Sequence, residues 1–399
     1  MGIFSKDKEK GELVLIFDIR SSSVGGALVL ARESGVPKII FSIREPIILQ
    51  KSLDTDQFLF STIEPLNIIA KKISAAGIGV PKRIFCTLSS PWYVSQIRII
   101  SLKKDKPFIF SSKLADDLIK QEIHVFEEEH LAEYTKTGHQ IRSIELKSIG
   151  TTLNGYEIQN PLDQKAEELE MTIFISMSPE QVISSIEGII KKLFHHKSIK
   201  FSSFVMSSFA VVHNMHMGQE NFLLVDIGGE ITDISMIKKG VLRESISFPL
   251  GYHFIIRETA SALSCTLPEA ESFISLLKDG HAEKATEEKL APIIDKLKMK
   301  WLEKFQESLA NLSKDISIPS DIYLSADTNF MNFFSKIIET EQFNQYTLTE
   351  SKFKINFLNT ETLHDLVEFE GNTLRDPFII IGSVYISHFF IYPARAGQV

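Results

Sequence analysis

The stretch FLLVDIGGEITDISMI, residues 222–237, decides the predicted fold, and VLIFDIRSSSVGGALVL, residues 14–30, repeats its pattern near the start of the chain. In each stretch an apolar strand ends in an aspartate, Asp226 or Asp18, before a tight turn and a second apolar strand. One such Asp-led hairpin is common in β-proteins. Two of them, each followed by mixed helices and strands, indicate a duplicated α/β architecture.

The residue types in both turns suit the binding of phosphate. A tight turn of small residues lets backbone N–H groups converge on an anion, and hydroxyl side chains add further donors. An aspartate at the end of each strand can hold a hydrated Mg²⁺, which offsets the charge of a nucleoside triphosphate. The sequence therefore predicts that a nucleoside triphosphate and Mg²⁺ bind between two facing turns, with Asp18 and Asp226 holding the metal through water.

Composition excludes several classes of protein. The chain has 399 residues, 44% of them hydrophobic, and a net charge of −8, which argues against a nucleic-acid partner. Its two cysteines are too few for a disulfide framework. Residues 1–12 are too polar for a secretory signal. The longest apolar run, residues 378–392, is shorter than a bilayer span, so we expect a buried helix and no transmembrane segment.

DIRSSSVGG, residues 18–26, and DIGGEITDI, residues 226–234, resemble the two phosphate turns of the actin-like ATPase superfamily. The resemblance implies an α/β fold in which duplicated ribonuclease-H-like domains surround a central nucleotide cleft, with an inserted small α+β domain. It also implies an order of segments: domain I at residues 1–90, the inserted domain at 91–177, the rest of domain I at 178–216, domain II at 217–250, its helical subdomain at 251–315, the rest of domain II at 316–376, and a C-terminal helix returning to domain I at 377–399.

Four further stretches resemble the FtsA branch of this superfamily: residues 155–194, residues 202–215 in the place of the helix before the second phosphate turn, and residues 248–263 and 267–280. That resemblance implies an ATP-binding, self-associating adaptor of bacterial cell division, cytoplasmic or peripheral at the inner face of the cell membrane, whose partner is a tubulin-like division filament protein. The PilM family shares the architecture. It implies instead a cytoplasmic scaffold of a type IV pilus system that binds a peptide from a pilus membrane protein.

The resemblance also implies which residues contact the nucleotide. Three departures from the family pattern stand beside them. Arg20 replaces a glycine in the first turn, Glu230 replaces a small residue in the second, and Ser325-Ala326-Asp327 replaces the glycine pair of the adenosine turn. A degenerate scaffold that no longer binds nucleotide is therefore a third alternative. The implied nucleotide contacts are Asp18, Ser21, Ser22, Ser23, Asp226, Gly228, Gly229, Thr232, Ser325 and Ala326.

Catalysis has little support in the sequence. No residue is an obvious general base, so the chain is at most a weak ATPase and its catalytic residues stay unassigned. A sugar kinase of the same superfamily would need a substrate aspartate in a cleft and a glycine-rich adenosine loop, and neither is visible.

Two helix starts are marked by short motifs. Ser178-Pro179-Glu180 combines a capping residue, a proline at the first helical position and an acid in the first turn. Asp376-Pro377 marks the start of the last helix in the same way. Within the long charged helix expected at 287–313, Trp301 is expected to point inward.

Overall fold

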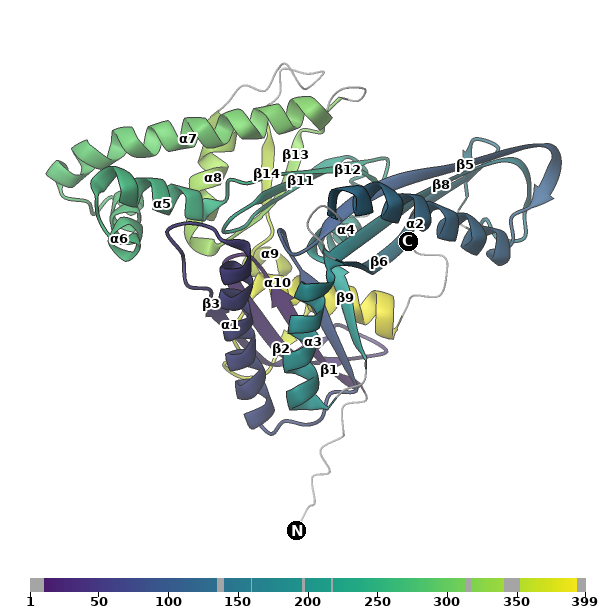
Figure 1. The fold of residues 1–399 in the computed structure, drawn as a ribbon, viewed down its shortest axis with the longest axis horizontal. Coiled ribbons are helices and arrows are strands. Elements are labelled where there is room, and N and C mark those ends of the chain that lie inside the picture. The colour runs from purple at the N-terminus through teal and green to yellow at the C-terminus, as the bar shows by residue number, and fades with distance from the viewer. Residues whose placement is uncertain are drawn as a thin grey trace, which may run out of the picture.

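The computed structural model describes residues 11–134, 140–158, 160–195, 198–216, 218–312, 317–340 and 352–392. The first ten residues of the polar lead lie outside them. The described residues form a six-stranded, a five-stranded and a four-stranded sheet. In Figure 1 the six-stranded sheet lies at the bottom, the five-stranded sheet in the upper middle with its helices to the upper left, and the four-stranded sheet at the upper right.

The six-stranded sheet has the order β15-β3-β2-β1-β4-β9. β1, β2 and β3 pair antiparallel, while β4 and β9 run parallel to β1. β1 is the central strand and its residues 14–17 are fully buried, because helices cover both faces of the sheet. The strands are β1 (Glu12–Ile19), β2 (Ser23–Ala31), β3 (Lys38–Pro46), β4 (Arg83–Leu88), β9 (Ile199–Ser203) and β15 (Glu368–Phe369).

The five-stranded sheet repeats this arrangement in the second half of the chain. Its order is β12-β11-β10-β13-β14. β10, β11 and β12 pair antiparallel, while β13 and β14 run parallel to β10. β10 corresponds to β1 and β11 to β2, so the duplication predicted from the two hairpins is present in the topology. The strands are β10 (Phe222–Ile227), β11 (Thr232–Lys238), β12 (Val241–Phe248), β13 (Asp321–Ala326) and β14 (Lys354–Phe357).

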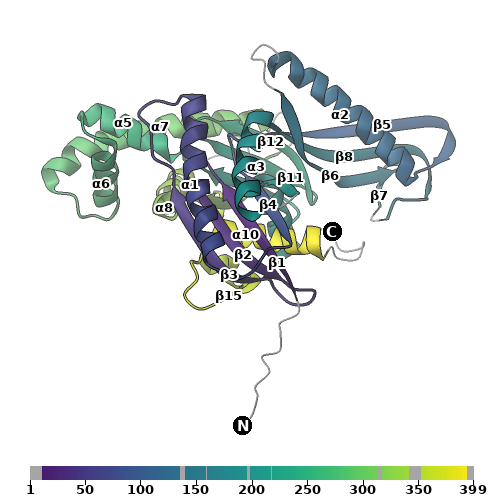
Figure 2. The same ribbon diagram turned by 60° about the horizontal axis from the view of Figure 1, so that its bottom comes forward.

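Helices cover both faces of the six-stranded sheet. α1 packs closely on β2, since a Cβ on Gly26 would lie 2.5 Å from Ile69 of α1. α10 lies on the opposite face, where Gly382 approaches Ile16, and Figure 2 shows the two helices on either side of the strands. The helices are α1 (Thr55–Ala75), α3 (Glu180–Phe194), α4 (Phe204–Met215), α9 (Thr360–Leu363), the 3₁₀ turn η1 (His364–Leu366), α10 (Pro377–Ile386) and the π-helical turn η2 (Ser387–Ile391).

The helices of the second half bury one aromatic cluster. Trp301 of α7 is fully buried, as predicted, and stacks on Phe305 with ring centroids 5.1 Å apart. Its indole N–H donates to the Thr232 hydroxyl at 3.2 Å, which anchors α7 to the start of β11. The helices are α5 (Tyr252–Leu263), α6 (Leu267–Lys278), α7 (Lys284–Leu312) and α8 (Thr328–Thr340).

The four-stranded sheet is inserted between β4 and α3. Its order is β5-β8-β6-β7, all antiparallel, and α2 packs against it. We propose that it forms the separate unit predicted at residues 91–177. Its elements are β5 (Val94–Ile109), α2 (Ser112–Tyr134), β6 (Ile141–Leu153), β7 (Tyr156–Glu157) and β8 (Lys165–Pro179).

The two predicted helix starts differ in outcome. Asp376 caps α10 by accepting hydrogen bonds from the N–H groups of Phe378 and Ile379. α3 begins at Glu180, but the Ser178 hydroxyl donates to the carbonyl of Trp92 at 2.6 Å instead of capping the helix. Within the described part of the chain, none of the helices is both long and apolar enough to cross a membrane.

Candidate functional site

The two turns that follow Asp18 and Asp226 lie directly against each other. The first turn, residues 20–22, joins β1 to β2, and the second turn, residues 228–231, joins β10 to β11. The Ser21 hydroxyl accepts a hydrogen bond from the backbone N–H of Glu230 at 3.2 Å. The structure thus brings together two segments that are about 200 residues apart, at the interface of the two duplicated halves.

Glycine permits this close approach in the second turn. A Cβ on Gly228 would lie 2.9 Å from Ser21 Oγ. A Cβ on Gly229 would lie 2.9 Å from Ser22 Cβ and 2.7 Å from the His253 ring. Both glycines therefore serve the contact between the turns, because any larger residue would push the two halves apart.

The start of α5 holds the second turn in place. Gly251, Tyr252 and His253 donate their backbone N–H groups to the carbonyls of residues 228–230 at 3.0, 3.1 and 2.8 Å. A Cβ on Gly251 would lie 2.3 Å from two of these carbonyl oxygens. This contact fixes the direction in which the second turn presents its N–H groups.

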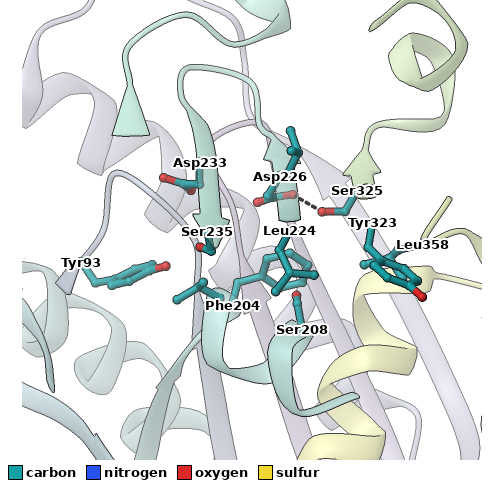
Figure 3. Close-up of a pocket in the computed structure, with 12 residues that line it drawn as sticks. Tyr93, Phe204, Ser208, Leu224, Asp226, Asp233, Ser235, Tyr323, Ser325 and Leu358 are labelled. Atoms are coloured by element: carbon teal, nitrogen blue, oxygen red, sulfur yellow. Dashed lines mark hydrogen bonds between the residues drawn. The ribbon is translucent and has the colours of Figure 1, made fainter. Parts of the chain in front are cut away.

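Asp226 is bound by an arginine from the other half. Both of its carboxylate oxygens accept hydrogen bonds from Arg20 Nη2, at 2.6 and 2.7 Å. The Ser325 hydroxyl donates to Asp226 Oδ1 at 2.6 Å (Figure 3). Asp226 is 9% exposed, and its predicted role in holding Mg²⁺ through water would compete with this ion pair.

Arg20 is packed on every side. Its guanidinium packs against two aromatic rings that also contact each other, 3.9 Å from the centroid of Phe378 and 4.5 Å from that of Phe204. Nη1 donates to the Ser89 hydroxyl at 3.2 Å, and the residue is 2% exposed. The side chain is therefore a fixed part of the interface between the halves, since rotation would leave its charge buried without a partner.

Asp18 has an equivalent arrangement with Arg44. Arg44 donates from Nη2 to Asp18 and from Nε to Asp376, each at 2.6 Å, and from Nη1 to the Ser23 hydroxyl at 2.9 Å. Burial raises the pKa of Asp18 above its ordinary value, although Arg44 and Arg20 oppose the shift. Asp18 Oδ1 is buried without a hydrogen-bond partner among the described residues, so one water molecule could complete its hydrogen bonding.

The remaining predicted contacts lie in the same region, but partners within the protein already engage them. The Thr232 hydroxyl donates to the carbonyl of Leu250 at 2.8 Å and accepts from Trp301. Ser22 is buried beside Tyr252. Ala326 ends β13, 1% exposed. The structure therefore gathers the predicted residues at one interface and leaves few of their polar groups available.

Glu230 is also neutralised within the protein. Its carboxylate is 2.7 Å from His253 Nδ1 and 3.0 Å from Arg257 Nη1, and Arg257 Nη2 makes a further ion pair with it. Burial alone would raise the pKa of Glu230, but the hydrogen bonds from His253 and Arg257 outweigh it and hold the pKa below its ordinary value. Glu230 is therefore a buried carboxylate that stays ionised.

A small cavity borders Asp226 on the side of β11. Figure 3 shows Asp226 and Asp233 near each other above Phe204, with Tyr93 to one side. The volume that the centre of a water molecule can reach is about 10 Å³, room for about one water molecule. Small-molecule sites occupy about 300–1,000 Å³. As placed here, the residues therefore do not fit a magnesium–nucleotide complex, because side chains fill the interface and hold both aspartates.

Asp233 gives the site a measurable pH dependence. Burial, and then the negative charge of Asp226, raise its pKa to about 6, while Ser247 and Ser90 donate hydrogen bonds to it. An unfolded aspartate titrates near 3.9. Between these two values the folded protein holds a proton that the unfolded chain releases, so the free energy of unfolding falls as pH rises from about 4 to 6.

We expect Asp233→Asn to raise the free energy of unfolding at pH 7.5 by about 1–2 kcal/mol, less than the full shift would give because part of the side chain reaches solvent. At pH 4 the variant and the wild type should unfold at the same denaturant concentration. Urea titrations at both pH values measure this. Asp105→Asn, on the exposed part of β5, is the control and should show no such difference. An equal effect of Asp233→Asn at both pH values would contradict the buried titration.

Sequence reasoning missed several members of the site. Arg44, Asp376, His253 and Arg257 hold the carboxylates, but they lie far from both turns in the sequence. The sequence predicts Asp376 only as a helix cap. Asp233 stands opposite Asp226 in the β10–β11 pairing, and its position seven residues after Asp226 in a two-stranded hairpin could have revealed it.

Comparisons with known proteins address the fold. No protein-family model and no curated protein matches the sequence. Among solved structures, the PilM-PilN type IV pilus biogenesis complex matches with a TM-score of 0.56 and 11% identity, covering 94% of this chain and 97% of that one. EutJ from Carboxydothermus hydrogenoformans matches with a TM-score of 0.42 and 10% identity, covering 95% of this chain and 90% of that one. A Bacteroides thetaiotaomicron protein with an actin-like ATPase fold matches with a TM-score of 0.38 and 10% identity, covering 96% of this chain and 98% of that one.

The identities are too low to transfer a function, and they bear on architecture alone. The similarity to the PilM structure extends over nearly the whole chain, and the topology contains the duplicated hairpin-led sheets that the sequence predicts. The chain therefore has the actin-like ATPase fold, an α/β fold with mixed sheets.

Proposed function

We propose that this protein is a PilM-like cytoplasmic scaffold, which binds an extended segment of a membrane-anchored pilus assembly protein at the inner face of the membrane. The similarity to the PilM structure carries this proposal. This similarity covers 94% of the chain. The inserted unit, which is the four-stranded sheet with its helix at residues 94–179, makes up about a fifth of the chain. The similarity therefore has to include most of the inserted unit as well as the two actin-like halves.

The state of the central cleft also favours a scaffold over an enzyme. Two arginines hold the aspartates that would bind a metal, and the turns contact each other directly. We therefore assign no catalytic step to this interface. The protein would then act through surfaces that bind other proteins.

β6 offers a place for an extended segment. On one side it pairs with β8 along its length, and on the other side, in the described part of the chain, β7 pairs only with Thr152 and Leu153. The exposed backbone groups of an edge strand can pair with a strand from a partner. β6 also reaches the first half: Glu145 accepts hydrogen bonds from Ser203 of β9 at 2.8 Å and from Tyr385 of α10 at 2.5 Å. In Figure 1, β6 forms the edge of its sheet next to β9.

The pairing of β6 with β8 shows which backbone N–H and C=O groups of β6 point away from β8. Glu180 donates its N–H to the carbonyl of Gln140 at 2.8 Å, and Pro179, which has no N–H, stands opposite Ile141. Backbone groups in an antiparallel pair alternate between the two sides. The N–H and C=O of Ser143 therefore point away from β8, to the side where a partner strand would add.

We expect Ser143→Pro to weaken binding of the pilus-type membrane protein's cytoplasmic segment at least about tenfold, because proline removes an outward N–H. Ser143→Ala keeps the N–H and is the matched control, expected to bind like the wild type. Biolayer interferometry with the immobilised segment measures both. Unchanged binding by Ser143→Pro would contradict β6 as the site.

The same assay separates this function from the FtsA-like role. If the chain captures a tubulin-like division filament protein and does not bind the pilus segment, the scaffold proposal is wrong and the division adaptor is favoured. If it binds neither, both proposals fail. Self-association is measured in the same samples by analytical ultracentrifugation.

A further inference from the structure

We propose that this chain carries its own substitutes for a bound metal–phosphate complex, with Arg20 in place of the cation and Glu230 in place of the anion, and that these side chains keep its two halves closed without a ligand. The contacts of the two turns are the same whichever partner the protein binds.

Arg20 supplies the positive charge. It belongs to the first half, and it binds both oxygens of Asp226 in the second half at 2.6 and 2.7 Å. A divalent cation held by Asp18 and Asp226 through water would neutralise these same carboxylates. In this protein Arg20 neutralises Asp226, and Arg44 neutralises Asp18. The rings of Phe204 and Phe378 hold the Arg20 guanidinium in position.

Glu230 supplies the negative charge. It stands in the second turn, where N–H groups would otherwise face a phosphate, and its carboxylate is bound by His253 and Arg257 of α5. A helix N-terminus favours an anion nearby, and Glu230 is 6% exposed and held ionised. Arg257 also approaches the carbonyl of Gln50 in the first half at 3.4 Å, which extends the contact across the interface.

The turns themselves complete the closure. The backbone N–H of Glu230, a donor that an oxyanion could use, is taken by the Ser21 hydroxyl at 3.2 Å. The glycines of the second turn pack against Ser21 and Ser22. A ligand would therefore have to separate the two halves and break the Arg20–Asp226 ion pair, which crosses their interface, before it could bind.

The first test uses the wild-type protein. Isothermal titration with tripolyphosphate and Mg²⁺, and with ATP and Mg²⁺, should show no saturable binding up to about 1 mM. The melting temperature should be the same with and without these ligands, because a ligand that does not bind the native state cannot stabilise it. Saturable, Mg²⁺-dependent binding in the micromolar range would overturn the proposal.

The second test removes the substitutes. Arg20→Gly with Glu230→Gly should bind Mg²⁺-tripolyphosphate at least about tenfold more tightly than the wild type. Tripolyphosphate is used because it needs no adenosine pocket. Arg20→Lys with Glu230 intact keeps both charges and is the matched control, expected to stay without binding. A folded double variant that fails to bind, or an Arg20→Lys variant that binds equally well, would contradict the assigned roles. If the double variant does not fold, the wild-type titration decides.

Discussion

Asp226→Ala is expected to lower the free energy of unfolding by about 3–5 kcal/mol, because it leaves the Arg20 charge buried without its partner. Arg20 is 2% exposed and packs against two aromatic rings, so water cannot easily replace the lost carboxylate. Ser325 loses its acceptor as well. Urea denaturation at pH 7.5 measures the loss. Added salt should change it little, since buried charges are poorly screened.

A double-mutant cycle separates the ion pair from its surroundings. Arg20→Met combined with Asp226→Leu removes both charges and replaces them with apolar volume, which costs far less than removing one partner. We therefore expect the double variant to be more stable than the single variant Arg20→Met or Asp226→Leu, with a strongly favourable coupling between the two positions. Additive losses would show that Arg20 and Asp226 do not act as a pair.

Gly251→Ala is expected to destabilise the protein by about 3 kcal/mol or more, since the new methyl group overlaps a rigid backbone. The added Cβ would lie 2.3 Å from the carbonyl oxygens of Gly228 and Gly229. To make room, α5 would have to move away from the second turn and lose the hydrogen bonds at its first residues. Thermal unfolding followed by circular dichroism measures the effect.

Gly188→Ala is the matched control for the same chemical change. Gly188 lies on the exposed side of α3, and a Cβ there meets no atom of the described residues within 4 Å. Alanine in a helix interior is more favourable than glycine by about 0.5–1 kcal/mol, so this variant should be slightly more stable than the wild type. Similar effects of both substitutions would contradict the packing described at Gly251.

The fold was accessible from the sequence because it depends on local patterns. The strands around Asp18 and Asp226 are short apolar runs that end at tight turns, and each hairpin forms between neighbouring segments. The Asp376-Pro377 motif predicted the start of α10 correctly, since a cap acts on the first turn of its own helix. At Ser178 the same logic failed, because the hydroxyl found a tertiary partner in Trp92.

The state of the cleft was decided by contacts between distant segments. The sequence shows that Arg20 and Glu230 are unusual in their turns, but it leaves open whether they repel a nucleotide, tune its binding or replace it. Arg44, Asp376 and Arg257 lie outside both turns, and only folding brings them to the carboxylates.

By itself, the sequence determined the duplicated α/β architecture, because hydrophobic periodicity and turn chemistry are local properties of the chain. Only the tertiary structure decided that Arg20 reaches Asp226 across the interface of the halves and that the turns touch. The reason is physical: the energy of a buried charge depends on what surrounds it in space, and its surroundings here come from segments hundreds of residues apart.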